Sequence, residues 1–217
     1  AKEAALVAER NDWWAQFEAL SALAQWKKEE AFPLLKNLVD EAPAVAGLMA
    51  SYLWKQSLPL IVRWSGLKDA ASDKAWEALR ASVPNEDLRA TRADMIKVLE
   101  DRKANRELRH QLALKTGQCS NEDEVKELLK KYDEEPDADT RLMLLAALYS
   151  SRSKQVIPLL QKDAREHADA PARLGARAQL KTMMLAAEYR PLLEWAAKND
   201  PDPSNRQQAV DELKSNP

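Results

Sequence analysis

The chain has 217 residues, of which 33 are Lys or Arg and 35 are Asp or Glu, so its formal net charge is −2. Its apolar content of 45% and charged content of 31% are typical of a soluble, folded protein and exclude a disordered chain, which has fewer apolar residues and a lopsided charge. Only four glycines argue against an all-β fold, because sheets and tight hairpins use glycine in turns with positive φ.

The inventory of reactive residues is equally restrictive. Cys119 is the sole cysteine, so an internal disulfide and a multi-cysteine metal cluster are excluded. His110 and His167 are the two histidines and leave little for histidine-based catalysis. No glycine-rich phosphate loop, HExxH motif or Ser/His/Asp arrangement is recognisable. We therefore expect an interaction module more than an enzyme, with no catalytic residue, no metal and no cofactor.

No segment approaches 18 consecutive apolar residues, so we expect no membrane insertion. The first six residues lack the apolar core of a signal peptide, and a chain that begins with alanine is compatible with methionine removal, signal cleavage or excision of a domain. These features slightly favour a cytoplasmic protein and leave an exported mature chain open. The near-neutral charge gives no long-range attraction toward nucleic acid or an anionic membrane.

Apolar residues recur with helical spacing along the chain, starting with a helix between Asp12 and Lys27. Prolines then interrupt the pattern near residues 43, 84, 136, 171 and 201, where following helices could begin. Further helices are predicted around 125–132 and 142–149, and no run has the period of two that marks a β-strand. The sequence thus predicts about a dozen helices joined by short connections, as in helical hairpins.

The most informative pattern is an internal repeat of 32–33 residues. In each copy an Asp, followed four residues later by an Arg, opens an apolar helix; the three copies begin at Asp137 and Arg141, at Asp169 and Arg173, and at Asp202 and Arg206. Pro-Leu-Leu marks the second helix at 158–160 and 191–193. We expect one domain, 1–217, with a first clear repeat at 12–40, irregular repeats at 41–104, and regular repeats at 105–217 that end in a C-terminal cap.

A period of this length, with one helix pair in each unit, predicts a stacked α-solenoid. One hairpin cannot bury the apolar faces of both of its helices, so each hairpin packs against the next. The Asp of each motif can cap free N–H groups at a helix start and offset the helix dipole. The Arg on the first turn can reach an Asp in its own or in the adjacent hairpin.

The Pro-Leu-Leu helix, the turn with Asp and the Asp-x-x-x-Arg motif before an Ala/Leu-rich helix together resemble HEAT repeats. The resemblance covers most of the chain and implies an all-α, right-handed α-solenoid of about six HEAT-like helical hairpins. In that family the Pro-Leu-Leu helix lies on the convex face, and the helix after the Asp–Arg turn lines the concave face. It also implies a structural ladder between neighbouring repeats, made here by Asp137, Arg141, Asp169, Arg173, Asp202 and Arg206. Gln16 replaces the Arg in the first copy, and residues 69–104 match the pattern poorly.

Four cationic residues are candidate partner-binding residues. Arg106 and His110 lie on one helical face within the basic stretch 89–115 and could contribute to a groove for an acidic peptide or for phosphates. Arg177 and Lys181 are four residues apart, so they share a helix face that the family geometry would turn toward the concave surface. The alternative in both cases is a solvated helix face whose charges pair with neighbouring acidic residues.

Two tryptophans near the N-terminus are the remaining candidate partner-binding residues. Trp13 and Trp14 are adjacent and therefore about 100° apart on a helix, so both cannot sit at the centre of one apolar seam. We expect one of them to face outward, where exposed tryptophan often anchors a partner. The alternative is that these wide side chains fill an atypical terminal repeat.

These features predict a non-catalytic scaffold or adaptor that holds a protein or peptide, including one with acidic segments, along a concave helical face. The alternative is a HEAT-like DNA-binding protein or alkylbase DNA glycosylase acting in the concave cleft. Tryptophan and basic residues permit that alternative, and the net charge of −2 weakens it. A bilin lyase-like or other modifying subunit is a third class that no residue favours. The sequence identifies neither the partner nor the oligomeric state.

Overall fold

A computed structural model describes residues 2–215, with side chains from residue 13 onward. This part of the chain forms fourteen α-helices and one short 3-10 helix and contains no β-strand, so the all-α prediction is confirmed. None of the described helices is both long and apolar enough to cross a bilayer. The helices are α1 (Lys2–Trp26), α2 (Lys28–Leu38), α3 (Ala44–Tyr52), α4 (Trp54–Ser65), α5 (Ala70–Arg80), α6 (Asn85–Ala90), α7 (Arg92–Glu100), α8 (Arg106–Cys119), α9 (Glu122–Glu134), α10 (Ala138–Ser151), η1 (Lys154–Val156), α11 (Ile157–Glu166), α12 (Ala170–Met183), α13 (Ala186–Asn199) and α14 (Pro203–Ser215).

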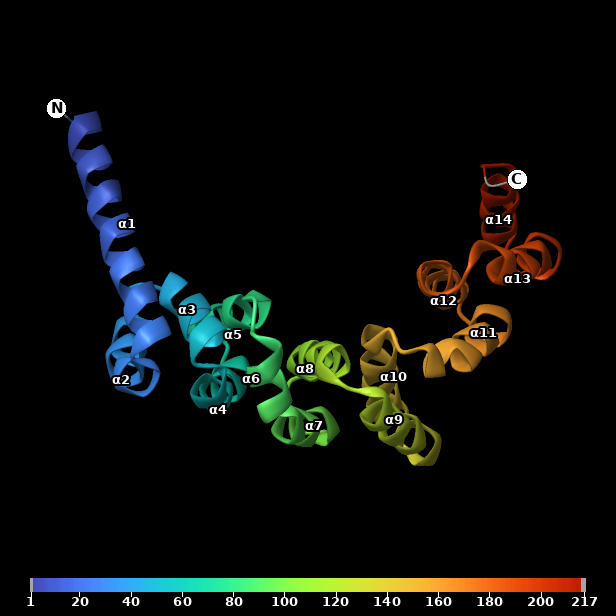
Figure 1. Ribbon diagram of the computed structural model, residues 1–217, viewed down its shortest axis with the longest axis horizontal. Coiled ribbons are helices and arrows are strands. Elements are labelled where there is room, and N and C mark those ends of the chain that lie inside the picture. The colour runs from blue at the N-terminus through green and yellow to red at the C-terminus, as the bar shows by residue number, and fades with distance from the viewer. Residues whose placement is uncertain (1, 216–217) are drawn as a thin grey trace.

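The helices follow one another along a curved, elongated arc that opens between the two chain termini (Figure 1). Helices α5, α8, α10, α12 and α14 lie on the inner side of this arc, and we call them the inner helices; α4, α7, α9, α11 and α13 lie on the outer side. Packing joins each inner helix to an outer one, as in α4 with α5, α7 with α8, α9 with α10, α11 with α12 and α13 with α14. The N-terminal part of α1 extends beyond the other helices.

The buried apolar side chains form two clusters instead of one central core. The first cluster runs from Ala24 to Cys119 and includes the fully buried Trp54, whose indole Nε1 donates a hydrogen bond to Thr91 Oγ1 at 2.7 Å. The second runs from Leu99 to Ala209. The clusters meet at α7 and α8, since both helices contribute side chains to each. The arc therefore has a core that is stretched along its length.

The closest approach of two inner helices occurs between α8 and α10. A Cβ atom placed on Gly117 would lie 1.9 Å from the carbonyl oxygen of Ala147 and 2.4 Å from Ser150 Oγ. Ser150 Oγ also donates a hydrogen bond to the Leu114 carbonyl oxygen at 2.5 Å. Gly117 is therefore required here for its lack of a side chain, because any larger residue would push the backbone of α10 away.

Polar residues placed just before the helices explain where several of them begin. Asn105 Oδ1 accepts hydrogen bonds from the N–H groups of the first turn of α8. Asn121 caps α9 in a capping box, in which the Glu124 carboxylate accepts the Asn121 N–H at 2.7 Å. Asp137 Oδ1 accepts the Thr140 N–H at 2.8 Å at the start of α10. Each cap satisfies donors that a helix start leaves without intrahelical partners.

The region 41–104, which the repeat motif describes poorly, has helices of unequal length and includes the shortest α-helix of the described residues. Its helices α3 to α7 have between 6 and 12 residues, whereas α8, α9 and α10 have 13 or 14. Helix α6 is the shortest, with 6 residues. Helices of unequal length change the number of residues between equivalent side chains, so the motif does not recur at 32–33 residues in this region.

Candidate functional site

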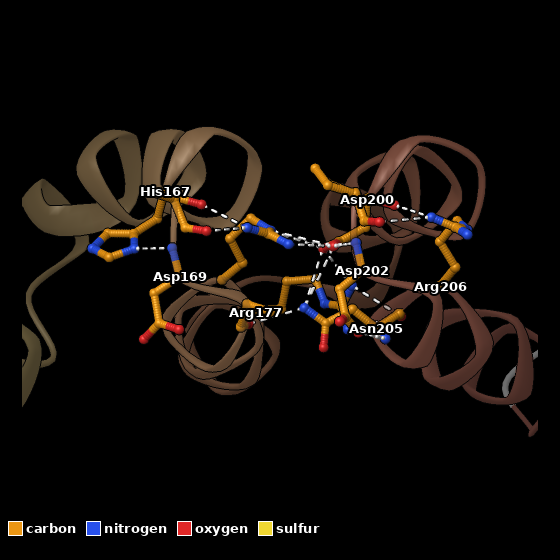
Figure 2. Close-up of polar contacts among 11 residues, drawn as sticks. His167, Asp169, Arg177, Asp200, Asp202, Asn205 and Arg206 are labelled. Carbon is orange, nitrogen blue, oxygen red and sulfur yellow. Dashed lines mark hydrogen bonds and ion pairs between the residues drawn. The ribbon is translucent and has the colours of Figure 1, made fainter.

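A buried network of charged side chains joins α12 to the start of α14 (Figure 2). The carboxylate of Asp200 is fully buried and accepts hydrogen bonds from Arg173, at 2.8 Å from Nη2 and 3.2 Å from Nε. Burial alone would raise the pKa of Asp200, but hydrogen bonds from Arg173, from the Asp202 N–H and from Asn205 outweigh it and hold this pKa below its ordinary value. The carboxylate therefore stays charged and compensates Arg173.

A second arginine enters the same network. Arg177 is only 2% exposed; its two terminal nitrogens each donate to the Asn205 carbonyl oxygen at 3.3 Å, and Nη1 lies 3.7 Å from Asp200 Oδ2. Its Nε has no hydrogen-bond partner among the described atoms. One carboxylate therefore faces two buried guanidinium groups. The expectation that Arg177 lies on an open concave surface is wrong, because α14 covers it.

The arginines of the repeat motif share some hydrogen-bond partners and differ in others. Arg173 Nη1 donates to the carbonyl oxygens six and five residues before it, those of His167 and Ala168, and Arg206 Nη1 does the same with those of Asp200 and Pro201. Arg109, one motif earlier than Arg141, is also buried. It donates to the Leu99 carbonyl oxygen at 2.8 Å and to Thr140 Oγ1 at 2.9 Å, and it contacts the Asp139 carboxylate.

Arg141 departs from this pattern. It is exposed, and its guanidinium lies over the Tyr132 ring at 4.8 Å from the ring centroid. The reason lies in the next repeat, at the position two residues before the motif Asp. In the sequence this position holds Asp200 in the repeat after Arg173 and His167 in the repeat after Arg141, and among the described residues Arg141 has no acidic partner. The prediction that Arg141 forms a rung of the ladder is therefore wrong.

The position two residues before each motif Asp has a second role that repeats along the chain. Its side chain accepts the N–H of the motif Asp in three consecutive copies: Glu135 accepts from Asp137 at 2.9 Å, His167 from Asp169 at 3.1 Å, and Asp200 from Asp202 at 3.0 Å. The resemblance to HEAT repeats predicted Asp137, Asp169 and Asp202 as the ladder carboxylates. In the structure Asp137 and Asp202 cap helices, and Asp169 makes no side-chain cap bond; Asp137 also lies 3.7 Å from Arg102 Nη1, and the carboxylates that pair with the buried arginines are Asp139 and Asp200.

The predicted cationic partner-binding residues do not form one open strip. Arg106 Nε donates to Asp139 Oδ1 at 2.8 Å, and this bond, ahead of the charge of Arg109, lowers the pKa of Asp139. Lys181 Nζ lies 2.7 Å from Glu212 Oε1, and His110 is half-buried. With Arg177 buried, the structure does not bring these four residues together. The expectation of a discontinuous basic strip is therefore wrong.

The two N-terminal tryptophans are both accessible. Trp13 is 38% exposed and Trp14 is 59% exposed. Their rings flank Phe17, with centroid distances of 5.9 Å and 6.0 Å. We call these three residues the aromatic cluster. Trp13 also lines a pocket of about 480 Å³ between α1 and the end of α2. We expected one exposed ring of the pair, and the structure exposes both.

Three pockets follow one another along the inner helices, at residues that the sequence pattern did not identify as a site. The first, of about 270 Å³, is lined by Trp76, Leu79, Arg80, Glu107 and Gln111. The second, of about 470 Å³, shares Leu79, Arg80 and Gln111 and adds Lys115 and Gln118. The third, of about 460 Å³, shares Gln118 and adds Tyr149, Arg152 and Gln179. Because neighbouring pockets share residues, we treat them as one surface and call it the inner groove.

The basic side chains of the inner groove differ in whether they have partners within the chain. Lys115 Nζ donates to the Ala81 carbonyl oxygen at 3.3 Å and lies 5.4 Å from the centroid of the Trp54 ring, and burial lowers its pKa. Arg80 and Arg152 are exposed and have no ion-pair partner within residues 13–215. The sequence indicates this groove in one way only. Helix α8 has a polar residue at every third or fourth position, from Glu107 through Gln111 to Gln118.

The described side chains offer little to hold a metal ion or to act as a nucleophile. No group of three or more His, Cys, Asp or Glu side chains in the described part of the chain is placed to bind a metal. Cys119 is buried at the end of α8, where its Sγ donates to the Thr116 carbonyl oxygen at 3.3 Å. Burial raises the pKa of this thiol, which makes it a weak nucleophile at neutral pH.

Comparison with known proteins gives no family to which these features could be assigned. No protein-family model matches the chain, and no curated protein is similar enough to it in sequence to be counted as a relative.

Proposed function

We propose that the chain is a right-handed α-solenoid of about six HEAT-like hairpins that acts as a non-catalytic scaffold and binds an extended peptide along its inner helices. The observation that carries this proposal is the inner groove, whose pockets follow one another across α5, α8, α10 and α12. The pairing of inner and outer helices along an arc, together with the motif stride of 32–33 residues, supports the architecture.

The chemistry of the inner groove suits a peptide main chain. Gln111, Gln118 and Gln179 each provide an amide that can both donate and accept hydrogen bonds, as peptide groups require. Arg80 and Arg152 add cations that can meet acidic side chains of the peptide. Because the groove is built on helices, little of the binding free energy is spent on ordering the receptor.

The contacts favour a peptide over nucleic acid. Binding of a nucleic acid backbone depends on several accessible cations. Of the four cationic candidates, Arg177 is buried and Arg106 and Lys181 are engaged by carboxylates. The inner groove contains Glu107 beside Arg80, and its neutral amides outnumber its unpaired cations. The glycosylase alternative therefore gains no support from the arrangement of these side chains.

The proposal can be tested with a display library of random extended peptides and with NMR. We expect selected peptides to be rich in Asp and Glu and to shift the side-chain amide resonances of Gln111, Gln118 and Gln179. A double variant, Arg80→Glu with Arg152→Asn, should weaken their binding by about tenfold or more. Asn is chosen at 152 because Arg152 has a φ of 52°, which Asn tolerates.

A matched control changes two exposed lysines outside the groove, Lys103→Glu with Lys198→Asn, and should leave peptide affinity unchanged. Equal loss of affinity in both double variants would show that net charge, and not the groove, governs binding. Peptides that bind both variants as tightly as the wild type would contradict the proposal. Duplex DNA that binds at low salt and dissociates steeply as salt rises would favour the glycosylase class instead.

A further inference from the structure

The turn between α12 and α13 exposes an apolar side chain at a position that usually holds a polar cap. Leu185, the N-cap residue of α13, is 72% exposed and offers no side-chain acceptor to the first turn. At the corresponding start of α9, Asn121 accepts two backbone N–H groups. Ser, Thr, Asp or Asn at this position normally stabilises the helix. The chain therefore gives up a cap at α13 and presents a leucine to the outside.

An amphipathic pocket lies beside this turn. It encloses about 600 Å³ between α12, α13 and the C-terminal end of α14. Met184, Leu193 and Leu213 provide apolar walls, and Lys181 and Arg190 line it with cationic groups. The sequence around the turn, from Met183 to Ala187, is apolar at five consecutive positions. Residues 185–187 of this run are exposed, and an exposed apolar stretch next to a pocket is typical of an interaction site.

The repeat explains why a pocket opens at this place. Lys181 and Glu212 lie 64 and 65 residues after Gly117 and Ala147, the pair at which α8 and α10 approach most closely. In the α12–α14 pair the same positions hold two long side chains that meet at 2.7 Å. These long side chains stand where the earlier pair has glycine and alanine, so α12 and α14 do not repeat the close backbone contact that Gly117 allows between α8 and α10.

The opposite end of the chain carries side chains of complementary character. The aromatic cluster of Trp13, Trp14 and Phe17 lies on α1, whose N-terminal part extends beyond the other helices (Figure 1). Between residues 2 and 26 the sequence has four acidic and two basic residues, a net charge of −2. The pocket lining has two basic residues and one acidic residue, a net charge of +1. Exposed aromatic rings thus lie at one end of the chain, and an apolar pocket lined by two basic residues opens at the other.

We propose that copies of this chain associate head to tail, with the aromatic cluster of one copy seated in the α12–α14 pocket of the next and with Leu185 at the edge of the contact. Lys181 and Arg190 face Glu18 of α1; their present ion pairs with Glu212 and Glu194 are partly exposed, and such pairs contribute little to stability. The two surfaces are different, so the contact is heterologous and adds copies in an open series. This proposal is independent of peptide binding by the inner groove.

The proposal is tested by sedimentation velocity and light scattering on the intact chain over a wide concentration range. We expect the mean mass to rise with concentration beyond that of a dimer. Trp14→Ala and Leu185→Asn should each weaken association by about tenfold or more, because each removes an apolar side chain that the contact buries. Leu185→Asn also restores a polar cap, so its thermal unfolding midpoint should not fall, which separates lost association from lost folding.

A mixing experiment distinguishes head-to-tail contact from pairing of like surfaces. The Trp14→Ala variant keeps an intact pocket and the Leu185→Asn variant keeps an intact aromatic cluster, so an equal mixture should form one-to-one dimers and nothing larger. Trp26→Ala and Leu34→Asn, two exposed apolar residues outside both surfaces, serve as controls and should associate like the wild type. A wild-type chain that stays monomeric at all concentrations, or variants that fail to complement each other, would overturn the proposal.

Discussion

Replacing Asp200 with alanine should expose how much the buried network contributes to the C-terminal helices. In the wild type its carboxylate is the only acidic group in direct contact with both Arg173 and Arg177 among the described residues, and all three side chains are at most 3% exposed. Asp200→Ala leaves two buried guanidinium groups without a counter-charge. Breaking a buried ion pair in this way costs about 3–5 kcal/mol, a large share of the roughly 5–15 kcal/mol by which domains are stable.

The repeat supplies a matched comparison for this prediction. Arg173→Met removes a buried arginine that donates to three residues, whereas Arg141→Met removes the exposed arginine at the equivalent position, which lies on Tyr132. An exposed cation–π contact contributes about 0.5–1 kcal/mol, so Arg141→Met should cost less than about 1 kcal/mol. The two substitutions are chemically identical, and the difference between them measures the network.

Denaturant titration followed by circular dichroism gives the free energy of unfolding, and amide hydrogen exchange locates the loss. We expect Asp200→Ala to increase exchange in α12–α14 while α3–α5 stay protected, because the two regions belong to different apolar clusters. A cost for Asp200→Ala no larger than that of Arg141→Met would refute the reasoning. An equal rise of exchange in α3–α5 would show that the two clusters unfold as one unit.

Three further outcomes follow from single side chains. The pKa of Asp200 in the folded chain is held below its ordinary value of about 3.9. The contribution of Asp200 to stability is therefore complete above about pH 3.9 and is lost as the pH falls through the pKa of the folded state. Asp200→Asn should thus make stability at acid pH, measured by denaturant titration, depend less on pH. Gly117→Ala should destabilise the chain by about 1–3 kcal/mol in the same assay, although alanine has a helix propensity about 1 kcal/mol better than glycine. Gly175→Ala is the control and should not destabilise the chain, because no atom lies within 4 Å of the new Cβ. Cys119 should react with iodoacetamide in the native state more slowly than in denaturant by orders of magnitude, as mass spectrometry would detect, because the folded chain buries the thiol.

The positions of the helices could be predicted because the spacing of apolar residues that marks a helix lies within the helix's own sequence. The class of fold needed only that local pattern and the near absence of glycine. The motif at Arg173 was also readable, since its stride of 32 residues from Arg141 is visible in the chain. What the motif could not convey is the identity of the residue that faces each arginine from the next repeat.

Three details depended on neighbours that the sequence does not reveal. Arg141 lacks a ladder partner because His167 stands where the next repeat has Asp200. Arg177 is buried because Asn205 and the rest of α14 close over it. The inner groove depends on how far α5, α8, α10 and α12 lie from one another, and a single glycine at 117 alters that spacing. In residues 41–104 the helices are unequal in length, from 6 to 12 residues, and a constant stride is therefore not visible in the sequence.

The stretched core affects how the molecule folds and how it unfolds under force. Even the hydrogen bond between Trp54 and Thr91 spans only 37 residues, and no packing interface brings α1 near α14 (Figure 1). Contacts of low sequence separation close small loops, so the chain should nucleate at several places and fold quickly for its size. Pulled from its termini, such an arc should lengthen by releasing one helix pair after another, and it should recover each pair independently once the force is removed.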